Sequence, residues 1–445
     1  MILAMFMCIA LACFCFLGPK TINAVASALD LNNIQNISIT LKYQGAKFVY
    51  NSCEHLPSCS TYLQERILLK NNRLGSHAGR AGVIEQMITH NIPIKDAFCY
   101  MFFDWNNYFD SIIARINKKP VDAKLEFLPN KKCCFDVTKE EYGYYLSETK
   151  VMEEILKQLH STDCIVVDLK PKTLLPNVYY SELIKQTSLL SKFSTNYSTS
   201  GVDRKNNINL AISKFNGLKI LPNQTISFNS ITGVRNKEKG YREAHMILNG
   251  EYIDAVGGGV CQVSTTLYNA LLLAGVRIDE VHSHSLPSSY VELGFDAMVN
   301  YGTSDLVFTN TNETPIYLKT YTTSEKVCVE VYGQECLPNV KIKRVCDVIS
   351  QTPPPVDRVI VDDAGEFLNE VEFSDEWFYK TKPKDGFKVN AYLEYISNGK
   401  VLRRKLIRTV TYSPQRGIKV FGAKTRPQNN FDQEFLKTIG NILAN

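Results

Sequence analysis

Residues 257–270 read GGGVCQVSTTLYNA, and this stretch decides the predicted fold. Three consecutive glycines allow backbone conformations closed to other residues and let a substrate approach the main chain. Apolar residues then recur at helical spacing through 262–274, and Gly275 follows as a terminator, so the pattern predicts a buried helix. Cys261 would stand at the start of that helix, where unpaired amides and the helix dipole lower the pKa of a thiol.

Residue types that activate a thiol follow this stretch. Residues 282–285 read His-Ser-His-Ser, and Asp296 comes shortly afterwards. His284 is placed to deprotonate Cys261 and later to protonate a leaving amine, while Asp296 would orient the imidazole. His282 is the alternative base. A free cysteine is also commonly a small buried hydrophobe, which is the structural alternative for Cys261.

Several groups near the thiol are candidates for binding substrate. The amides of Cys261 and Gln262 at the helix start can stabilise a developing oxyanion, and the Gln262 side chain is a further donor to the same oxygen. Arg242 is a candidate for binding a substrate carboxylate. The other residues that we expect around the substrate are Gly258, Gly259, Ser264, Thr265 and Tyr290.

The same histidines allow a metal to be considered. His282 and His284 are two residues apart, so on a strand both would face the same way and form a zinc site with Cys261. No carboxylate or further cysteine stands at metal-ligand spacing. We therefore predict a site with no metal and no cofactor.

The bulk composition narrows the class of protein. The chain has 445 residues, enough for several domains, and its net charge of +5 is spread without a dense basic block. It shows no nucleic-acid-binding motif, so nucleic acid is not a predicted partner. Residues 1–17 are almost wholly apolar, and Ala-Ser-Ala at 26–28 is typical of a cleavage site. Residues 1–28 are therefore predicted to be a signal peptide, with an uncleaved membrane anchor as the alternative, and the body to be exported to the cell wall or extracellular face.

Cysteine usage is unusual for an exported chain. Of the 13 cysteines, Cys8, Cys13 and Cys15 lie in the leader, and an odd number remains once Cys261 is also set aside. Two pairs are close enough in sequence to close short disulfide loops, Cys53 with Cys59 and Cys328 with Cys336. Many of the others are expected to be reduced.

The chain is predicted to be α+β and multidomain. It comprises a compact α+β catalytic domain, an α/β N-terminal binding region and a small β-rich C-terminal domain. Beyond the leader the predicted boundaries are 30–118, 119–192, 193–336, 337–422 and a terminal segment 423–445. A polar run at 194–200 and the prolines at 353–355 are typical of a boundary and a linker.

Helices are predicted over 81–89, 108–117, 147–159, 178–191 and 207–215. Strands are predicted over 37–49, 121–127, 164–169, 226–231, 245–253, 306–309, 316–320, 326–332, 387–395 and 401–412.

The span from about 193 to 332 resembles the VanW domain, named for a protein of glycopeptide-resistance clusters. The matching motifs are FST at 193–195, RKNNI at 204–208, FN at 228–229, GYREA at 240–244, residues 257–270, HSLP at 284–287, Tyr290, Gly294, Asp296-Ala297 and Asp305-Leu306. Residues 120–183 are similar to a domain assigned to peptidoglycan binding that precedes VanW domains, and 30–118 to a diverged copy of it. The region 340–422 is similar to a small β domain named for its five glycines, although several of those glycines are missing.

The resemblance implies work on the bacterial cell wall, with peptidoglycan stem peptides and glycan as partners. VanW-family members have been assigned L,D-transpeptidase activity. On that basis Cys261 would attack the carbonyl of a diamino acid in a tetrapeptide stem and release the terminal D-amino acid. The amine of a second stem would then resolve the thioester and form a cross-link. A thiol-dependent carboxypeptidase or endopeptidase, and a non-catalytic wall-binding accessory protein, remain open as alternatives.

Overall fold

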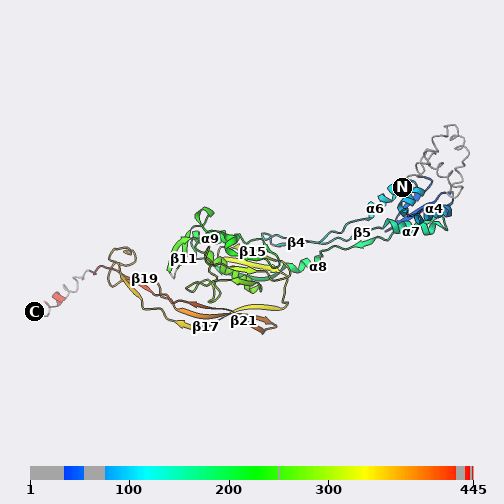
Figure 1. Cartoon of the computed structure of the whole chain (residues 1–445). Coiled ribbons are helices and arrows are strands. Elements are labelled where there is room, and N and C mark those ends of the chain that lie inside the picture. The colour runs from blue at the N-terminus through cyan, green and yellow to red at the C-terminus, as the bar shows by residue number, and fades with distance from the viewer. Residues whose placement is uncertain (1–34, 55–75, 249–250, 427–435, 441–442, 444–445) are drawn as a thin grey trace. The chain divides into compact units, whose positions relative to one another are not determined.

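The computed structural model describes residues 35–54, 76–248, 251–426, 436–440 and 443. The fold is mixed α+β and multidomain, as predicted. The chain divides into two compact units, residues 1–124 with 139–179, and residues 125–138 with 180–445 (Figure 1). The predicted leader at 1–28 lies outside the described residues. In the described part of the chain, no helix is long and apolar enough to span a membrane.

The first unit is a small α/β layer. Its sheet has the order β2-β1-β6, from Ala46–Asn51, Ser38–Tyr43 and Cys164–Asp168, with β1 and β6 parallel. Four helices pack around a shared core: α4 (His77–Thr89), α5 (Ile94–Met101), α6 (Trp105–Ile116) and α7 (Glu148–Leu159). Because β6 pairs with β1, the boundary placed at residue 118 does not coincide with a division of this sheet. The paired strands β5 (Gly143–Tyr145) and β7 (Lys172–Leu174) complete the unit.

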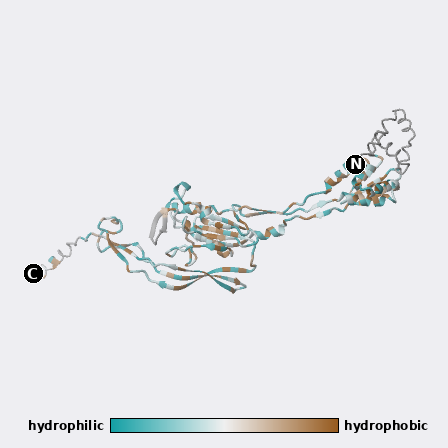
Figure 2. Cartoon of the chain, viewed as in Figure 1, coloured by the Kyte–Doolittle hydropathy of each residue, from teal (hydrophilic) through white to brown (hydrophobic). Residues whose placement is uncertain are grey.

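The second unit is built around one buried helix, α11 (Val260–Leu273), which confirms the predicted helix. It packs against a four-stranded antiparallel sheet of order β8-β16-β15-β9, formed by Ser188–Asn196, Lys326–Gly333, Ile316–Thr322 and Leu218–Ile220. Hydroxyl groups join the two layers: Thr195 Oγ1 lies 2.8 Å from Thr266 Oγ1, and Ser191 Oγ donates to Ala270 O at 2.6 Å. Hydrophobic residues are concentrated where these layers meet (Figure 2). We call residues 180–336 the central domain.

Smaller elements surround this core. Helix α9 (Val202–Ser213) covers one side, and β10 (Thr225–Ser227), β14 (Val307–Thr309) and β13 (Arg277–Glu280) form a second sheet. Strands β11 (Glu243–Leu248) and β12 (Glu251–Val256) form a hairpin that leads into the glycine run. The short hairpin of β3 (Lys124–Phe127) and β4 (Phe135–Thr138) packs its phenylalanines on Tyr317 and Tyr332.

Four of the predicted elements are wrong. The strands predicted over 37–49 and 245–253 are each a hairpin of two strands, β1 with β2 and β11 with β12. The helix predicted over 178–191 is only the short α8 (Tyr180–Leu183) and a 3₁₀ turn (Ile184–Thr187), after which the chain extends into β8. The strand predicted over 226–231 ends at Ser227, whose side chain accepts a hydrogen bond from Ser230 N and caps α10 (Phe228–Thr232). The polar run at 194–200 is the end of β8 and the loop after it, because Tyr197 packs into the core.

Residues 337–422, here called the C-terminal β domain, contain two three-stranded sheets. The first has the order β17-β20-β21, from Val340–Thr352, Gly386–Ser397 and Lys400–Tyr412. The turn predicted at Asn398-Gly399 is confirmed, and both residues have positive φ, 49° and 77°. The second sheet has the order β18-β22-β19, from Arg358–Val361, Ile418–Phe421 and Trp377–Thr381, and the proline run precedes β18. Side chains from β20 join the core of the central domain, so the two domains pack together.

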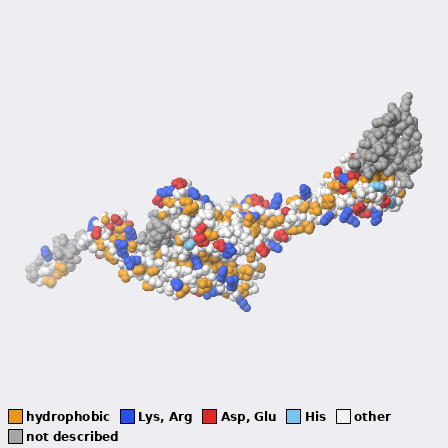
Figure 3. Space-filling view, viewed as in Figure 1, with side chains coloured by type: hydrophobic (Ala, Val, Ile, Leu, Met, Phe, Trp, Pro, Cys, Tyr) orange, Lys and Arg blue, Asp and Glu red, His pale blue; other side chains and the backbone are white. Residues whose placement is uncertain are grey.

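Surface charge and cysteine pairing complete the description. Lys and Arg side chains are interspersed with Asp and Glu on the face shown in Figure 3. Cys328 is buried on β16 and Cys336 is exposed, and both are free thiols, so the predicted loop closure between them is wrong. The Cys53 and Cys59 pair involves a residue outside the described ranges.

Candidate active site

The glycine run places Cys261 at the head of α11. Gly257 and Gly259 have φ values of 93° and 102°, which favour glycine, and Gly259 is the N-cap. Gly258 has ordinary φ, but a Cβ atom there would lie 2.3 Å from the backbone oxygen of Ala244 on β11. All three glycines are therefore needed to bring the chain close to β11 and turn it into the helix, with the Cys261 thiol at its first turn.

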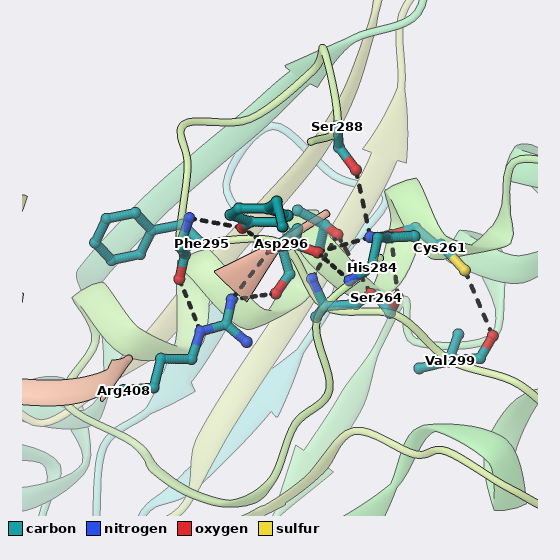
Figure 4. A network of polar contacts seen from close by, with 12 residues as sticks. Cys261, Ser264, His284, Ser288, Phe295, Asp296, Val299 and Arg408 are labelled. Atoms are coloured by element: carbon teal, nitrogen blue, oxygen red, sulfur yellow. Dashed lines mark hydrogen bonds and ion pairs between the residues drawn. The ribbon is translucent and has the colours of Figure 1, made fainter. Parts of the chain in front are cut away.

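The structure brings Cys261, His284 and Asp296 together. Asp296 Oδ2 accepts hydrogen bonds from the backbone N–H of His284 and from its Nδ1, each at 2.7 Å. Both residues are buried, with 7% of His284 and 1% of Asp296 exposed. Since Nδ1 is engaged by Asp296, Nε2 is the nitrogen left for Cys261, and Figure 4 shows the imidazole between the other two side chains. Cys261 Sγ also lies 3.4 Å from Val299 O.

The electrostatics of this array favour a thiolate and an imidazolium. Burial acts to raise the pKa of Cys261, but the hydrogen bond and charge of His284 outweigh burial, so the net effect is a lowered pKa. Burial acts to lower the pKa of His284, and hydrogen bonds to Asp296 and Cys261 reverse this and raise it to about 9. The pKa of Asp296 is lowered, because its bond to His284 outweighs its own burial. These are the properties of an activated nucleophile with an oriented base.

A second set of contacts holds Asp296 from the C-terminal β domain. Tyr412 Oη donates to Asp296 Oδ1 at 2.6 Å and accepts from Gly294 N at 2.8 Å. The Arg408 guanidinium donates to Gly294 O at 2.7 Å and also to the backbone oxygen of Asp296 (Figure 4). Both side chains come from β21. The carboxylate is therefore fixed by two domains.

Ser264 and Thr265, predicted to contact substrate, are fully buried and have another role. Ser264 Oγ donates to Ala297 O at 2.6 Å, and Thr265 Oγ1 accepts from Ala297 N at 2.9 Å. Asn269, one turn further along α11, donates to Phe295 O at 2.8 Å. These bonds tie the segment that contains Asp296 to the helix that contains Cys261. They position the array and do not face the cleft.

The thiol opens into a cleft of about 260 Å³. It is lined by Asn196, Tyr197, Thr199, Ser200, Arg204, Gly257, Gly259, Cys261, Gln262, His284, Ser288, Ser289 and Tyr290. Of the predicted substrate contacts, Gly259, Gln262 and Tyr290 are thus at the cleft. Gly258 is just behind it, and its carbonyl accepts from Asn207 Nδ2 at 3.0 Å.

Of the three groups proposed to donate to an oxyanion, only the Cys261 N–H is still available in the structure. Gln262 N–H donates to Gly259 O at 3.0 Å. Its side-chain Nε2 donates to Thr195 Oγ1 at 3.0 Å and to Asn196 O at 2.8 Å, so both of its donor groups are occupied. The expectation that Gln262 donates to an oxyanion is therefore corrected: it joins α11 to β8. The Cys261 N–H has no acceptor among the described residues, and it remains the donor available at the helix start.

Comparison with known proteins gives a family match that covers the site. A family model described as VanW like protein matches residues 203–332, which include Cys261, His284 and Asp296. Residues 203–332 are therefore similar to the VanW family and are called the VanW domain here. It is 27% identical over 254 residues to the uncharacterized protein YoaR of Bacillus subtilis (strain 168), covering 57% of this chain and 81% of that protein. It is 28% identical over 134 residues to the vancomycin B-type resistance protein VanW of Enterococcus faecalis (strain ATCC 700802 / V583), covering 29% of this chain and 49% of that protein. The match therefore spans about half the length of this second relative.

Two solved structures match the chain over 19% of its length. The crystal structure of HP0197-G5 is 22% identical with a TM-score of 0.11, and the match covers 95% of that chain. The IgA1 protease G5 domain structure is 17% identical with a TM-score of 0.12, and the match covers 94% of that chain.

Two predicted residues of the VanW domain lie away from its cleft. Arg242 is exposed and pairs with Asp203 at 2.9 Å, so its charge is already matched. His282 Nε2 lies 2.8 Å from Glu280 Oε1, and the histidine is not among the residues that line the cleft. Both side chains are thus engaged with carboxylates outside the cleft. Among the described residues, no group of three His, Cys, Asp or Glu side chains is placed to hold a metal ion.

Several residues of the site were not predicted, and three of them have charged or polar side chains that matter for the chemistry: Arg204, Arg408 and Tyr412. Arg204 lines the cleft of the VanW domain, and its position at the start of α9 did not indicate this. The RKNNI motif at 204–208 was the available signal, because it belongs to the same family pattern as the cysteine. No motif includes Tyr412 or Arg408, and on a β-strand both follow the ordinary alternation of side chains.

Proposed function

We propose that this chain is a cysteine-dependent acyltransferase, an L,D-transpeptidase that cross-links peptidoglycan stems. The observation that supports this best is the pairing of Cys261 with a buried, carboxylate-bound His284 at the wall of a cleft. A thiol of lowered pKa beside an oriented imidazole is suited to attack on an amide carbonyl. A merely structural cysteine requires neither of these features.

The choice of substrate rests on family and context. One relative is a vancomycin B-type resistance protein by name. The resemblance of residues 193–332 to VanW domains implies peptidoglycan stem peptides as the substrate. The apolar leader supports export to the compartment where peptidoglycan is cross-linked, with membrane anchorage as one form of that leader. We extend the proposal to the flanking domains, which would hold wall polymer while the VanW domain acts on the stem peptides.

The proposed reaction has two steps. In the first, Cys261 Sγ attacks the carbonyl carbon of the third stem residue, the S–C bond forms, and the C–N amide bond breaks. The imidazolium of His284 gives its proton to the leaving amine, and the Cys261 N–H stabilises the oxyanion. In the second step, neutral His284 accepts a proton from the amine of another stem as that nitrogen attacks the thioester. The C–S bond breaks, the cross-link forms, and the thiolate–imidazolium pair is restored.

The test uses the purified chain and its Cys261→Ala and Cys261→Ser variants with disaccharide-tetrapeptide, analysed by mass spectrometry. The proposal predicts cross-linked dimers with wild type and none with Cys261→Ala. Trapping with substrate alone should give a thioester adduct on the peptide that contains Cys261. Shortened monomers without dimers would instead assign a thiol carboxypeptidase, in which water takes the place of the amine. Full activity of Cys261→Ala would refute the assignment of the nucleophile, and binding without turnover would indicate an accessory protein.

A further inference from the structure

Arg204 is the charged side chain of the cleft that the proposed reaction leaves without a role. It lies in the first turn of α9 and lines the same cleft as Cys261. Its Nη1 donates to Ser200 Oγ at 2.6 Å, which fixes the guanidinium on the cleft wall. Its stem is packed on the glycine run, because a Cβ at Gly259 would lie 2.9 Å from Arg204 Cγ. The run thus makes room for an arginine beside the thiol.

The charge of Arg204 is not matched by a carboxylate in the described part of the chain. No Asp or Glu is among the residues that line the cleft, and no ion pair joins Arg204 to a described acidic residue. The guanidinium of Arg204 therefore places a positive charge on the cleft wall near Cys261. Arg242 is the opposite case, since it lies outside the cleft and is paired with Asp203.

We propose that Arg204 binds the free carboxylate of the substrate residue that is released, so that the enzyme selects peptides ending one residue beyond the scissile bond. This inference rests on the proposed function. A guanidinium presents five N–H donors in a planar fork that matches a carboxylate, and only one is used by Ser200. The α-carboxylate of a leaving D-amino acid is close to the scissile nitrogen, so its binding site must lie beside the nucleophile, where Arg204 is.

The experiment compares two substrates that differ only in that charge. These are disaccharide-tetrapeptide with a free C-terminal carboxylate and the same compound as the C-terminal carboxamide. For wild type we expect kcat/KM to be about tenfold to a hundredfold higher for the acid. Arg204→Gln should lower kcat/KM for the acid and bring the ratio to within about twofold of one. Arg204→Lys should keep part of the preference, because it retains the charge without the fork.

Controls separate this proposal from the proposed function. Arg277→Gln, an exposed arginine paired with Asp279, should leave the acid-to-amide ratio unchanged. A wild type that turns over both substrates equally, or an Arg204→Gln variant that keeps the preference, would overturn the carboxylate site while leaving the nucleophile intact. Loss of the preference in Arg242→Gln alone would assign the role to that residue instead. If Arg204→Gln does not fold, acid and amide binding to the inactive Cys261→Ala protein, measured by calorimetry, decides the question: equal affinities contradict the proposal.

Discussion

The two oxygens of Asp296 are held by different parts of the molecule. Oδ2 accepts from the backbone and ring of His284, a residue 12 positions away in the same domain. Oδ1 accepts from Tyr412, which is 116 positions away on β21 of the C-terminal β domain. We call the contacts of Oδ2 with His284 the near side of Asp296. They keep the imidazole charged, since the hydrogen bond to Asp296 helps to raise the pKa of His284 to about 9. We call the contacts that Tyr412 and Arg408 make from β21 the far side of Asp296. These two side chains contact neither the cleft nor the thiol.

The contacts of the far side fix the position of Asp296. Tyr412 holds both the carboxylate and the Gly294 N–H, and Arg408 holds the carbonyls of Gly294 and Asp296. Burial and the charge of Asp296 raise the pKa of Tyr412, so its hydroxyl stays protonated and always available as a donor. A domain outside the VanW match therefore fixes the backbone and side chain of the carboxylate on which the catalytic array depends.

Removing the carboxylate breaks both sides at once and should have the largest effect. Asp296→Asn keeps the shape of the side chain but cannot stabilise an imidazolium, so the thiolate of Cys261 becomes less populated at neutral pH. We expect kcat/KM to fall by about 10²–10⁴, as when the carboxylate behind a catalytic histidine is replaced elsewhere. The rate of Cys261 alkylation by iodoacetamide at pH 7 should fall in parallel. Unchanged alkylation would mean that Asp296 does not control the pair.

The near side was predictable from sequence and the far side was not. Helical spacing, Gly275 and the order Cys261, His284, Asp296 are local or short-range patterns, and they predicted α11 and the array. The hydrogen bonds from Tyr412 and Arg408 to Gly294 and Asp296 span more than a hundred residues, and the alternation of side chains along a strand does not distinguish Tyr412. Gln262 shows the same limit, because no sequence pattern indicates that its side-chain amide joins α11 to β8.

Tyr412→Phe breaks only the far side and should have an intermediate effect. The variant leaves Asp296 Oδ1 and the Gly294 N–H without the hydroxyl, inside a buried site, at a cost of about 1–3 kcal/mol in the free energy of unfolding. We expect a fall of about tenfold in kcat/KM. The upper pH limit of the rate profile should also change, because Asp296 would position His284 less firmly.

The matched control is Tyr379→Phe on β19, which removes a hydroxyl bonded to Asp357 at 2.7 Å in the other sheet of the same domain. That variant should leave the pH profile unchanged and cost less stability, because this pair is only half-buried. If both variants behave alike, the far side of Asp296 is ordinary structural support.

The pH dependence of reactivity tests the near side without any substitution. Alkylation of Cys261 should stay fast through neutral pH and fall only as pH drops through its lowered pKa. Burial raises the pKa of Cys99, Cys328, Cys336 and Cys346, so these thiols should react appreciably only at alkaline pH. Enzyme turnover should also fall as pH rises through about 9, where His284 loses the proton it gives to the leaving amine. Mass spectrometry of partially labelled protein resolves the individual sites.

The smallest effect is expected at His282, which forms a similar pair without the far side. It contacts Glu280 at 2.8 Å much as His284 contacts Asp296 at 2.7 Å, but its side chain is 40% exposed and that of His284 is 7% exposed. An exposed ion pair contributes about 0–1 kcal/mol, so His282→Gln should change kcat/KM by less than about twofold. His284→Gln should lower kcat/KM by about 10²–10⁴, the range typical of general acid–base catalysis. A histidine and a carboxylate within hydrogen-bonding distance are therefore not sufficient for catalysis. Equal losses in the two variants would show that burial and the contacts from β21 do not distinguish His284 from His282.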